Sequence, residues 1–141
     1  MNREEAIKLL ALIKVAYPAA YKDMDNASKN ATVNMWQTTF PNVPYQIMEM
    51  AFNRYRMSSK FPPTVAEMCD ELKHLHWKAI EEAMRAAVFG RKDDIRKYEW
   101  IMECTEVYRS DEYLDIPVYT SVQRLSSGAV AGALESGKDG E

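Results

Sequence analysis

Between residues 2 and 109, apolar side chains recur three or four positions apart, which is the spacing of one face of an α-helix. Runs of this kind follow one another along the chain, and a proline, a glycine or a capping residue stands at most of their ends. No convincing series of strands, with alternating apolar and polar residues, interrupts them. The pattern therefore predicts an all-α fold.

The first two predicted helices are bounded by caps and prolines. The first begins at Asn2, which opens a capping-box spacing, and Pro18 ends or bends it. The second begins between Asn26 and Asn30 and closes at Pro41. The residues expected to face the core from these two helices are Ala6, Leu9, Leu10, Ile13, Ala16, Tyr17, Val33, Trp36 and Phe40.

A third helix follows after a very short connection. We expect Asn42 or Val43 to cap it and Pro44 to lie in its first turn, where a missing N–H costs little. Its predicted buried stripe consists of Ile47, Met48, Ala51, Phe52 and Tyr55.

A pair of prolines separates the third helix from the fourth. Pro62 and Pro63 break the helical path and hold their predecessors in extended backbone. Thr64 and Glu67 then give the spacing of a capping box. Phe61 is expected to pack back onto the first turns. The segment therefore predicts a sharp, well-specified corner between two helices.

The fourth predicted helix is unusually long for so small a protein. It starts at Val65, and nothing in the pattern stops it before Gly90, so that a straight helix of about 25 residues would be about 37 Å long. Asp93 or Asp94 can cap a fifth helix, which we expect to pack against the distal half of the fourth as an αα-hairpin. The stripe expected to be buried on the distal half of the fourth helix is Ile80, Ala83, Met84, Ala87 and Val88.

The same pattern suggests a division of the chain into three parts. We expect a compact domain of about four helices over residues 1–72, a helical extension over 73–109 and a mostly disordered, flexible tail over 110–141, whose end is rich in Gly, Ser and Ala. The tail begins with an apolar island that could order on a partner protein. The predicted partner-binding residues in this island are Tyr113, Leu114, Ile116, Val118 and Tyr119.

Composition narrows the range of functions. The chain has 141 residues, of which 47% are hydrophobic, and it lacks both a signal-peptide core and an apolar run near the roughly 20 residues that cross a bilayer. We therefore expect a cytoplasmic protein with no membrane partner. Its formal net charge is -3, and acidic residues interleave with the basic ones, which favours a mixed, solvated surface over direct binding of nucleic acid.

Candidate chemistry is sparse. His74 and His76 stand two positions apart on a predicted helix and so point to different sides, which argues against a shared metal ion; we expect His74 to be solvated and His76 to lie beside the apolar stripe. Phosphate-binding loops, nucleophile elbows and dinucleotide fingerprints are absent from the sequence. We expect no catalytic residue, no metal and no cofactor, and hence no enzyme.

An ordered series of motifs in the first half resembles a family of phage proteins. These motifs are Tyr17-Pro18 after an apolar helix, Val33 with Trp36 and Phe40, Pro44-Tyr45 at the start of a helix, and the run from Lys60 to Met68. Over residues 2–72, the chain is similar to the replicative-helicase loader and inhibitor proteins of phages that infect Gram-positive bacteria.

The resemblance implies a small all-helical adaptor in the cytoplasm of the bacterial host. Such a protein binds a ring-shaped replicative DNA helicase, holds it inactive and helps to deliver it to an origin-bound initiator. It implies no catalytic activity and assigns none of the matched residues to a contact.

The residues leave other functions open. A DNA-binding replication or regulatory protein could use the helices around Pro62 and Pro63 as a helix-turn-helix variant. A phage inhibitor of a host factor would show the same sequence features. A homodimer through the fourth helix is also open, because the fifth helix need not cover all of its distal apolar surface.

Overall fold

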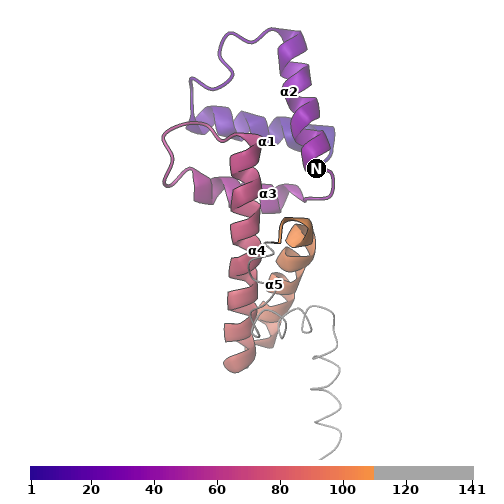
Figure 1. Cartoon of the computed structure of the whole chain (residues 1–141), viewed down its shortest axis with the longest axis vertical. Helices are drawn as coiled ribbons and strands as arrows, with labels where there is room; N and C mark the ends of the chain where they lie inside the picture. The colour runs from indigo at the N-terminus through magenta and orange to yellow at the C-terminus, as the bar shows by residue number, and fades with distance from the viewer. Residues whose placement is uncertain (110–141) are drawn as a thin grey trace, which may run out of the picture. The chain divides into compact units, whose positions relative to one another are not determined.

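The computed structural model describes residues 1–109 of the chain, and every element that it forms there is helical (Figure 1). The predicted all-α fold is therefore confirmed. Residues Met1–His74 form one compact unit, and a second unit starts at Leu75, so the boundary lies inside the fourth helix. The division at residues 72 and 109 stays a prediction, and the tail lies outside the described residues.

The first unit contains three complete helices and the start of a fourth. These are α1 (Arg3–Ala16), α2 (Asn26–Thr39), α3 (Tyr45–Tyr55) and the first residues of α4 (Val65–Val88). α1 packs against both α2 and α3. The side chains that fill this core most completely are Leu9, Ile13, Phe40, Ile47, Met48, Phe52, Met68 and Leu72.

Local chemistry explains where these helices begin. Asn2 and Glu5 form the predicted capping box, in which each side chain accepts a hydrogen bond from the other's backbone N–H. Asp25 caps α2 by accepting from the N–H of Ser28. Pro44 is the N-cap of α3, whereas we expected it inside the first turn; its extended backbone (φ -62°, ψ 151°) places its carbonyl to accept the first helical hydrogen bonds.

The amino group of Met1 ties α1 to the connection between α2 and α3. It donates hydrogen bonds to the carbonyl oxygens of Phe40 at 2.9 Å, Pro41 at 3.2 Å and Val43 at 2.9 Å. An ammonium group has three N–H donors, so all of them are satisfied here. Met1 is itself buried, and this contact fixes the short connection that follows α2.

The corner between α3 and α4 forms as predicted around Thr64 and Glu67. The Glu67 carboxylate accepts from the backbone N–H of Thr64 at 3.1 Å, and the Thr64 hydroxyl accepts from the N–H of Glu67 at 3.2 Å. The Tyr55 hydroxyl also lies 2.8 Å from Glu67 Oε2, which links the end of α3 to the start of α4. The expectation for Phe61 was wrong: its side chain is 77% exposed, and only its carbonyl is held, at 3.0 Å from the Tyr55 hydroxyl.

The second unit is a helical hairpin. It contains the distal part of α4, then α5 (Lys92–Thr105) and a short 3₁₀ turn, η1 (Glu106–Tyr108). α5 packs against α4 as predicted (Figure 1). The buried side chains of this unit are Ala79, Ile80, Ala83, Ala86, Ile101, Met102 and Thr105, together with His76.

The turn between α4 and α5 depends on Gly90. Its φ of 69° is left-handed, and the next N–H, of Arg91, bonds the carbonyl of Ala86 at 2.9 Å, which is the pattern of a Schellman motif. α5 starts two residues earlier than we expected, with Arg91 as its N-cap, and the two aspartates lie in its first turn. There they still interact favourably with the positive end of the helix.

Candidate partner-binding surfaces

An apolar cleft opens between α1 and α2 in the first unit. It has a volume of about 340 Å³. Ile7 is 47% exposed there, although isoleucine is usually buried. The residues that line the cleft are Ile7, Leu10, Ala11, Lys14, Tyr21, Met24, Lys29, Asn30, Thr32 and Val33. The cleft can therefore receive apolar groups.

The connection between α1 and α2 forms part of the cleft and has an unusual backbone. Tyr21 and Asp23 adopt left-handed φ values of 57° and 62°. Such a conformation costs on the order of 1–3 kcal/mol for a residue other than glycine, so surrounding contacts must hold it. Burial of Tyr21 raises the pKa of its hydroxyl, and the neighbouring Ala20 is 5% exposed. These contacts anchor the connection and preform this side of the cleft.

The polar residues of the cleft carry positive charge. Lys14 and Lys29 line it, and no acidic residue does. Within residues 1–109, neither lysine forms an ion pair. The Asn30 amide is held in place because its oxygen accepts a hydrogen bond from Arg3 at 3.0 Å. An anionic group would therefore find two exposed ammonium groups beside an apolar surface.

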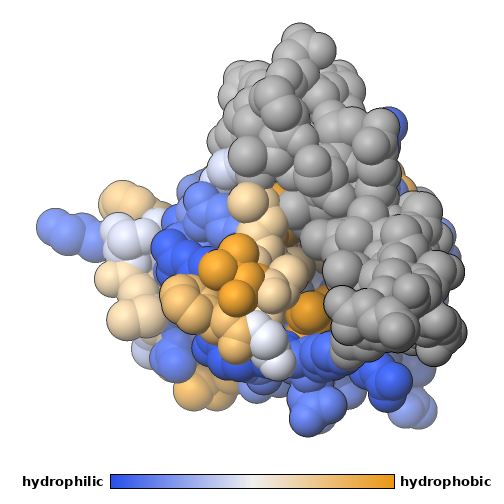
Figure 2. Space-filling view, turned by 90° about the horizontal axis from the view of Figure 1, so that it is seen from below, coloured by the Kyte–Doolittle hydropathy of each residue, from blue (hydrophilic) through white to orange (hydrophobic). Residues whose placement is uncertain are grey.

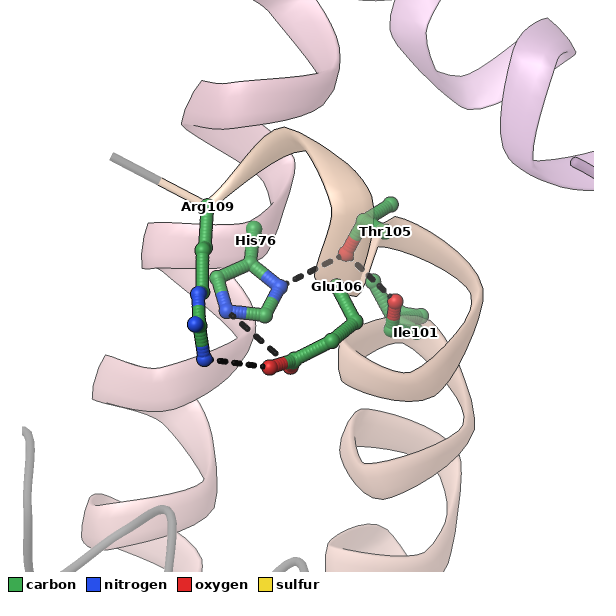
Figure 3. A network of polar contacts seen from close by, with 5 residues as sticks. All are labelled: His76, Ile101, Thr105, Glu106 and Arg109. Carbon is green, nitrogen blue, oxygen red and sulfur yellow. Dashed lines mark hydrogen bonds and ion pairs between the residues drawn. The ribbon is translucent and has the colours of Figure 1, made fainter. Parts of the chain in front are cut away.

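A buried polar network links α4 and α5 in the second unit (Figure 3). The Thr105 hydroxyl donates to the carbonyl of Ile101 at 2.6 Å and lies 2.9 Å from His76 Nδ1. A hydroxyl has only one proton, so Nδ1 must be the donor in this second contact. His76 Nε2 then faces Glu106 Oε2 at 3.9 Å, and Arg109 holds the other oxygen of this carboxylate at 2.9 Å.

The environment of His76 favours the neutral ring. Burial lowers the pKa of this histidine below its usual value, and the Arg109 charge lowers it further. The Glu106 carboxylate and a hydrogen bond to the Met102 backbone act in the opposite direction. His76 is 3% exposed and belongs to the core of the hairpin, whereas we placed it beside the apolar stripe. Its role is to join two helices.

The other histidine also departs from expectation. His74 is half-buried, and its Nε2 is shielded from solvent without a hydrogen-bond partner in the described part of the chain. The expectation of a solvated side chain was therefore wrong. Among residues 1–109, no three His, Cys, Asp or Glu side chains gather closely enough to hold a metal ion.

Two large apolar residues are exposed where α4 ends. Val88 is 79% exposed and Phe89 is 72% exposed. Figure 2 looks at the molecule from this end and shows hydrophobic atoms gathered among hydrophilic ones. We expected Val88 to continue the buried stripe, but the buried positions follow Ala79, Ala83 and Ala86 instead. This end of the hairpin is a second apolar surface.

Positive charges on α4 are paired with acidic neighbours. Lys73 lies near Asp70, Lys78 near Glu81 and Arg85 near Glu82, and Arg54 of α3 contacts Glu71 at 3.1 Å. Such exposed pairs add little stability. They do show that this helix carries a mixed surface, without the uniform positive face that a DNA-reading helix requires.

The predicted partner-binding residues of the tail lie outside the described residues. Their positions, from Tyr113 to Tyr119, stay a prediction. In the described part of the chain, no helix combines the length and the apolar character needed to cross a bilayer.

The fold and these surfaces define a small helical protein with a compact N-terminal unit. Residues 1–69, almost all of that unit, match the family model for the N-terminal domain of gp39P-like phage helicase loader/inhibitor proteins. This segment belongs to a phage helicase-associated family, which confirms the resemblance predicted over residues 2–72. Comparisons with curated proteins and with solved structures found no match.

Sequence reasoning missed the cleft. Ile7 and Ala11 fall outside the predicted stripe of α1, and the lysines resemble ordinary solvated residues. The available signal was weak: Ile7 is an apolar residue on the polar side of an amphipathic helix. The connection after Pro18 gave no warning, since neither Tyr21 nor Asp23 is a glycine.

Proposed function

We propose that this protein is a non-catalytic adaptor of phage DNA replication that binds a replicative DNA helicase in the cytoplasm of the bacterial host. The family match over residues 1–69 carries the proposal, because the family is one of helicase-interacting phage proteins. An all-helical body with exposed apolar surfaces is compatible with such a role. The adaptor loads the helicase or holds it inactive, and an origin-bound initiator is the second partner that delivery requires.

The tail is the proposed site of helicase contact. Its apolar island alternates with acidic residues in the run Asp111-Glu112-Tyr113-Leu114-Asp115-Ile116. Segments of this composition often order when they dock on a partner, because burial of the apolar side chains then offsets the loss of conformational entropy. The contact would include Tyr113, Leu114, Ile116, Val118 and Tyr119.

Co-purification with the replicative helicases of phage and host tests the proposal. The full chain is expected to retain a helicase through size-exclusion chromatography, and failure with both enzymes would refute helicase binding. A variant with serine at positions 113, 114, 116, 118 and 119 is expected to lose the complex. The matched control changes the polar neighbours Thr120→Ala and Ser121→Ala and should keep it. Equal capture by both variants would remove the island from the contact.

Helicase activity separates loading from inhibition. A loader should increase the amount of helicase on single-stranded DNA coated with its binding protein, whereas an inhibitor should lower ATP hydrolysis and unwinding by preassembled helicase. Duplex DNA serves as a further probe. The mixed charge of α4 predicts no steeply salt-dependent binding to it.

A further inference from the structure

We propose that the cleft between α1 and α2 binds an acidic, apolar peptide segment of a partner protein. One or two large apolar side chains of the segment enter the cleft, and carboxylates next to them pair with Lys14 and Lys29. This site is separate from the proposed helicase contact in the tail, and it does not depend on that contact.

The size and lining of the cleft favour a peptide side chain. A volume of about 340 Å³ lies at the small end of the range for ligand sites, about 300–1,000 Å³. Ile7, Leu10, Met24 and Val33 provide most of its apolar surface. Moving an apolar side chain from water into such a space is favourable, and the exposed part of Ile7 would be covered as well.

Charge determines which apolar segment fits. The only charged residues that line the cleft are Lys14 and Lys29, and neither is neutralised by an ion pair in the described part of the chain. Carboxylates of the segment would be attracted to them, whereas a basic segment would be repelled. Opposite charge at the rim and apolar contact inside together select an acidic, apolar partner.

The cleft is also formed before any partner binds. The left-handed residues Tyr21 and Asp23 hold the connection in one conformation, and the Tyr17 hydroxyl fixes its start by donating to the carbonyl of Ser59 at 2.8 Å. A preformed site loses less conformational freedom on binding. The strained backbone therefore has a use at this position.

A selection experiment tests the proposal without assuming a partner. A random linear peptide library displayed on phage is panned against the full chain, and selected peptides are measured by fluorescence polarisation. We expect the selected sequences to combine large apolar residues with Asp or Glu and to bind more weakly as salt increases. The double variant Lys14→Glu, Lys29→Glu should weaken them by about tenfold or more. Ile7→Asn should also weaken them.

Matched controls come from exposed residues outside the cleft. Lys22→Glu and Val15→Asn make the same kinds of change nearby, and both should leave peptide affinity unchanged. Circular dichroism melts confirm that each variant is folded. Backbone amide shifts in NMR spectra should change most around the cleft.

Three results would overturn the proposal. The first is the selection of no peptide above background. The second is selection of peptides without acidic residues, or of peptides that bind the cleft variants as well as the original chain. The third is a dimer in sedimentation that Ile7→Asn dissociates, because a second copy would then occupy the cleft. A negative helicase co-purification leaves this test unaffected, so the two proposals fail separately.

Discussion

Replacing Thr105 by valine tests the network that joins α4 to α5. The side chain is fully buried, and valine has nearly the same shape, so no large cavity forms. The change removes the hydroxyl that accepts from His76 Nδ1 at 2.9 Å. The Ile101 carbonyl keeps its helical hydrogen bond, so the loss falls on the histidine.

The expected cost follows from this geometry. A buried donor left without its partner destabilises a protein by about 1–3 kcal/mol. A hydrogen bond to the Met102 backbone also holds the ring, which places the cost of Thr105→Val in the lower half of that range. Urea unfolding followed by far-ultraviolet circular dichroism measures it as a difference in the free energy of unfolding.

Two further variants make the measurement specific. Thr39→Val removes a hydroxyl that also donates to the carbonyl four residues earlier, but on an exposed surface, and should change stability by less than about 0.5 kcal/mol. In a His76→Phe background, Thr105→Val should cost much less than in the original chain. Equal costs for Thr105→Val and Thr39→Val, or no coupling with His76, would refute the proposed hydrogen bond.

Three other predictions concern the two units. The pKa of His76 is lowered on folding, so the unfolded chain takes up the proton first, and the free energy of unfolding should fall as pH drops below about 6.5, by at most ~1.4 kcal/mol per pH unit; urea unfolding across this range should show a weaker slope for His76→Phe, and an unchanged slope would contradict the assignment. Trp36→Ala should cost about 3–5 kcal/mol, because this residue is 2% exposed and its ring lies 5.9 Å from that of Phe40; an unchanged melting temperature would place Trp36 outside the core. Gly90→Ala should cost about 1 kcal/mol in thermal unfolding through its left-handed φ alone, since an added Cβ meets no atom within 4 Å, and Gly90→Asn should cost less; equal stability of all three chains would show that the turn relaxes.

Features set by neighbouring residues could be predicted well. The capping boxes at Asn2 and Thr64 form as expected, because each needs only two side chains three positions apart. The apolar stripes of α1 and α3 are buried for a similar reason. The start of α5 was less certain, because aspartates stabilise the first turn as well as the cap.

The candidate surfaces were harder to predict. Val88 continues an apolar pattern but lies exposed, because the helix it belongs to ends beyond the part that α5 covers. His76 occupies a core position because Thr105, 29 residues away, supplies a hydrogen-bond partner. Neither outcome depends on local spacing.

The sequence by itself determined the helices, their main caps, the corner at the two prolines and the family of the first 69 residues, because spacing and backbone preference act over a few positions. Only the tertiary structure decided which apolar and charged residues remain on the surface. The cleft with Lys14 and Lys29 exists because α1, α2 and the strained connection between them leave a space that none of their own side chains fills.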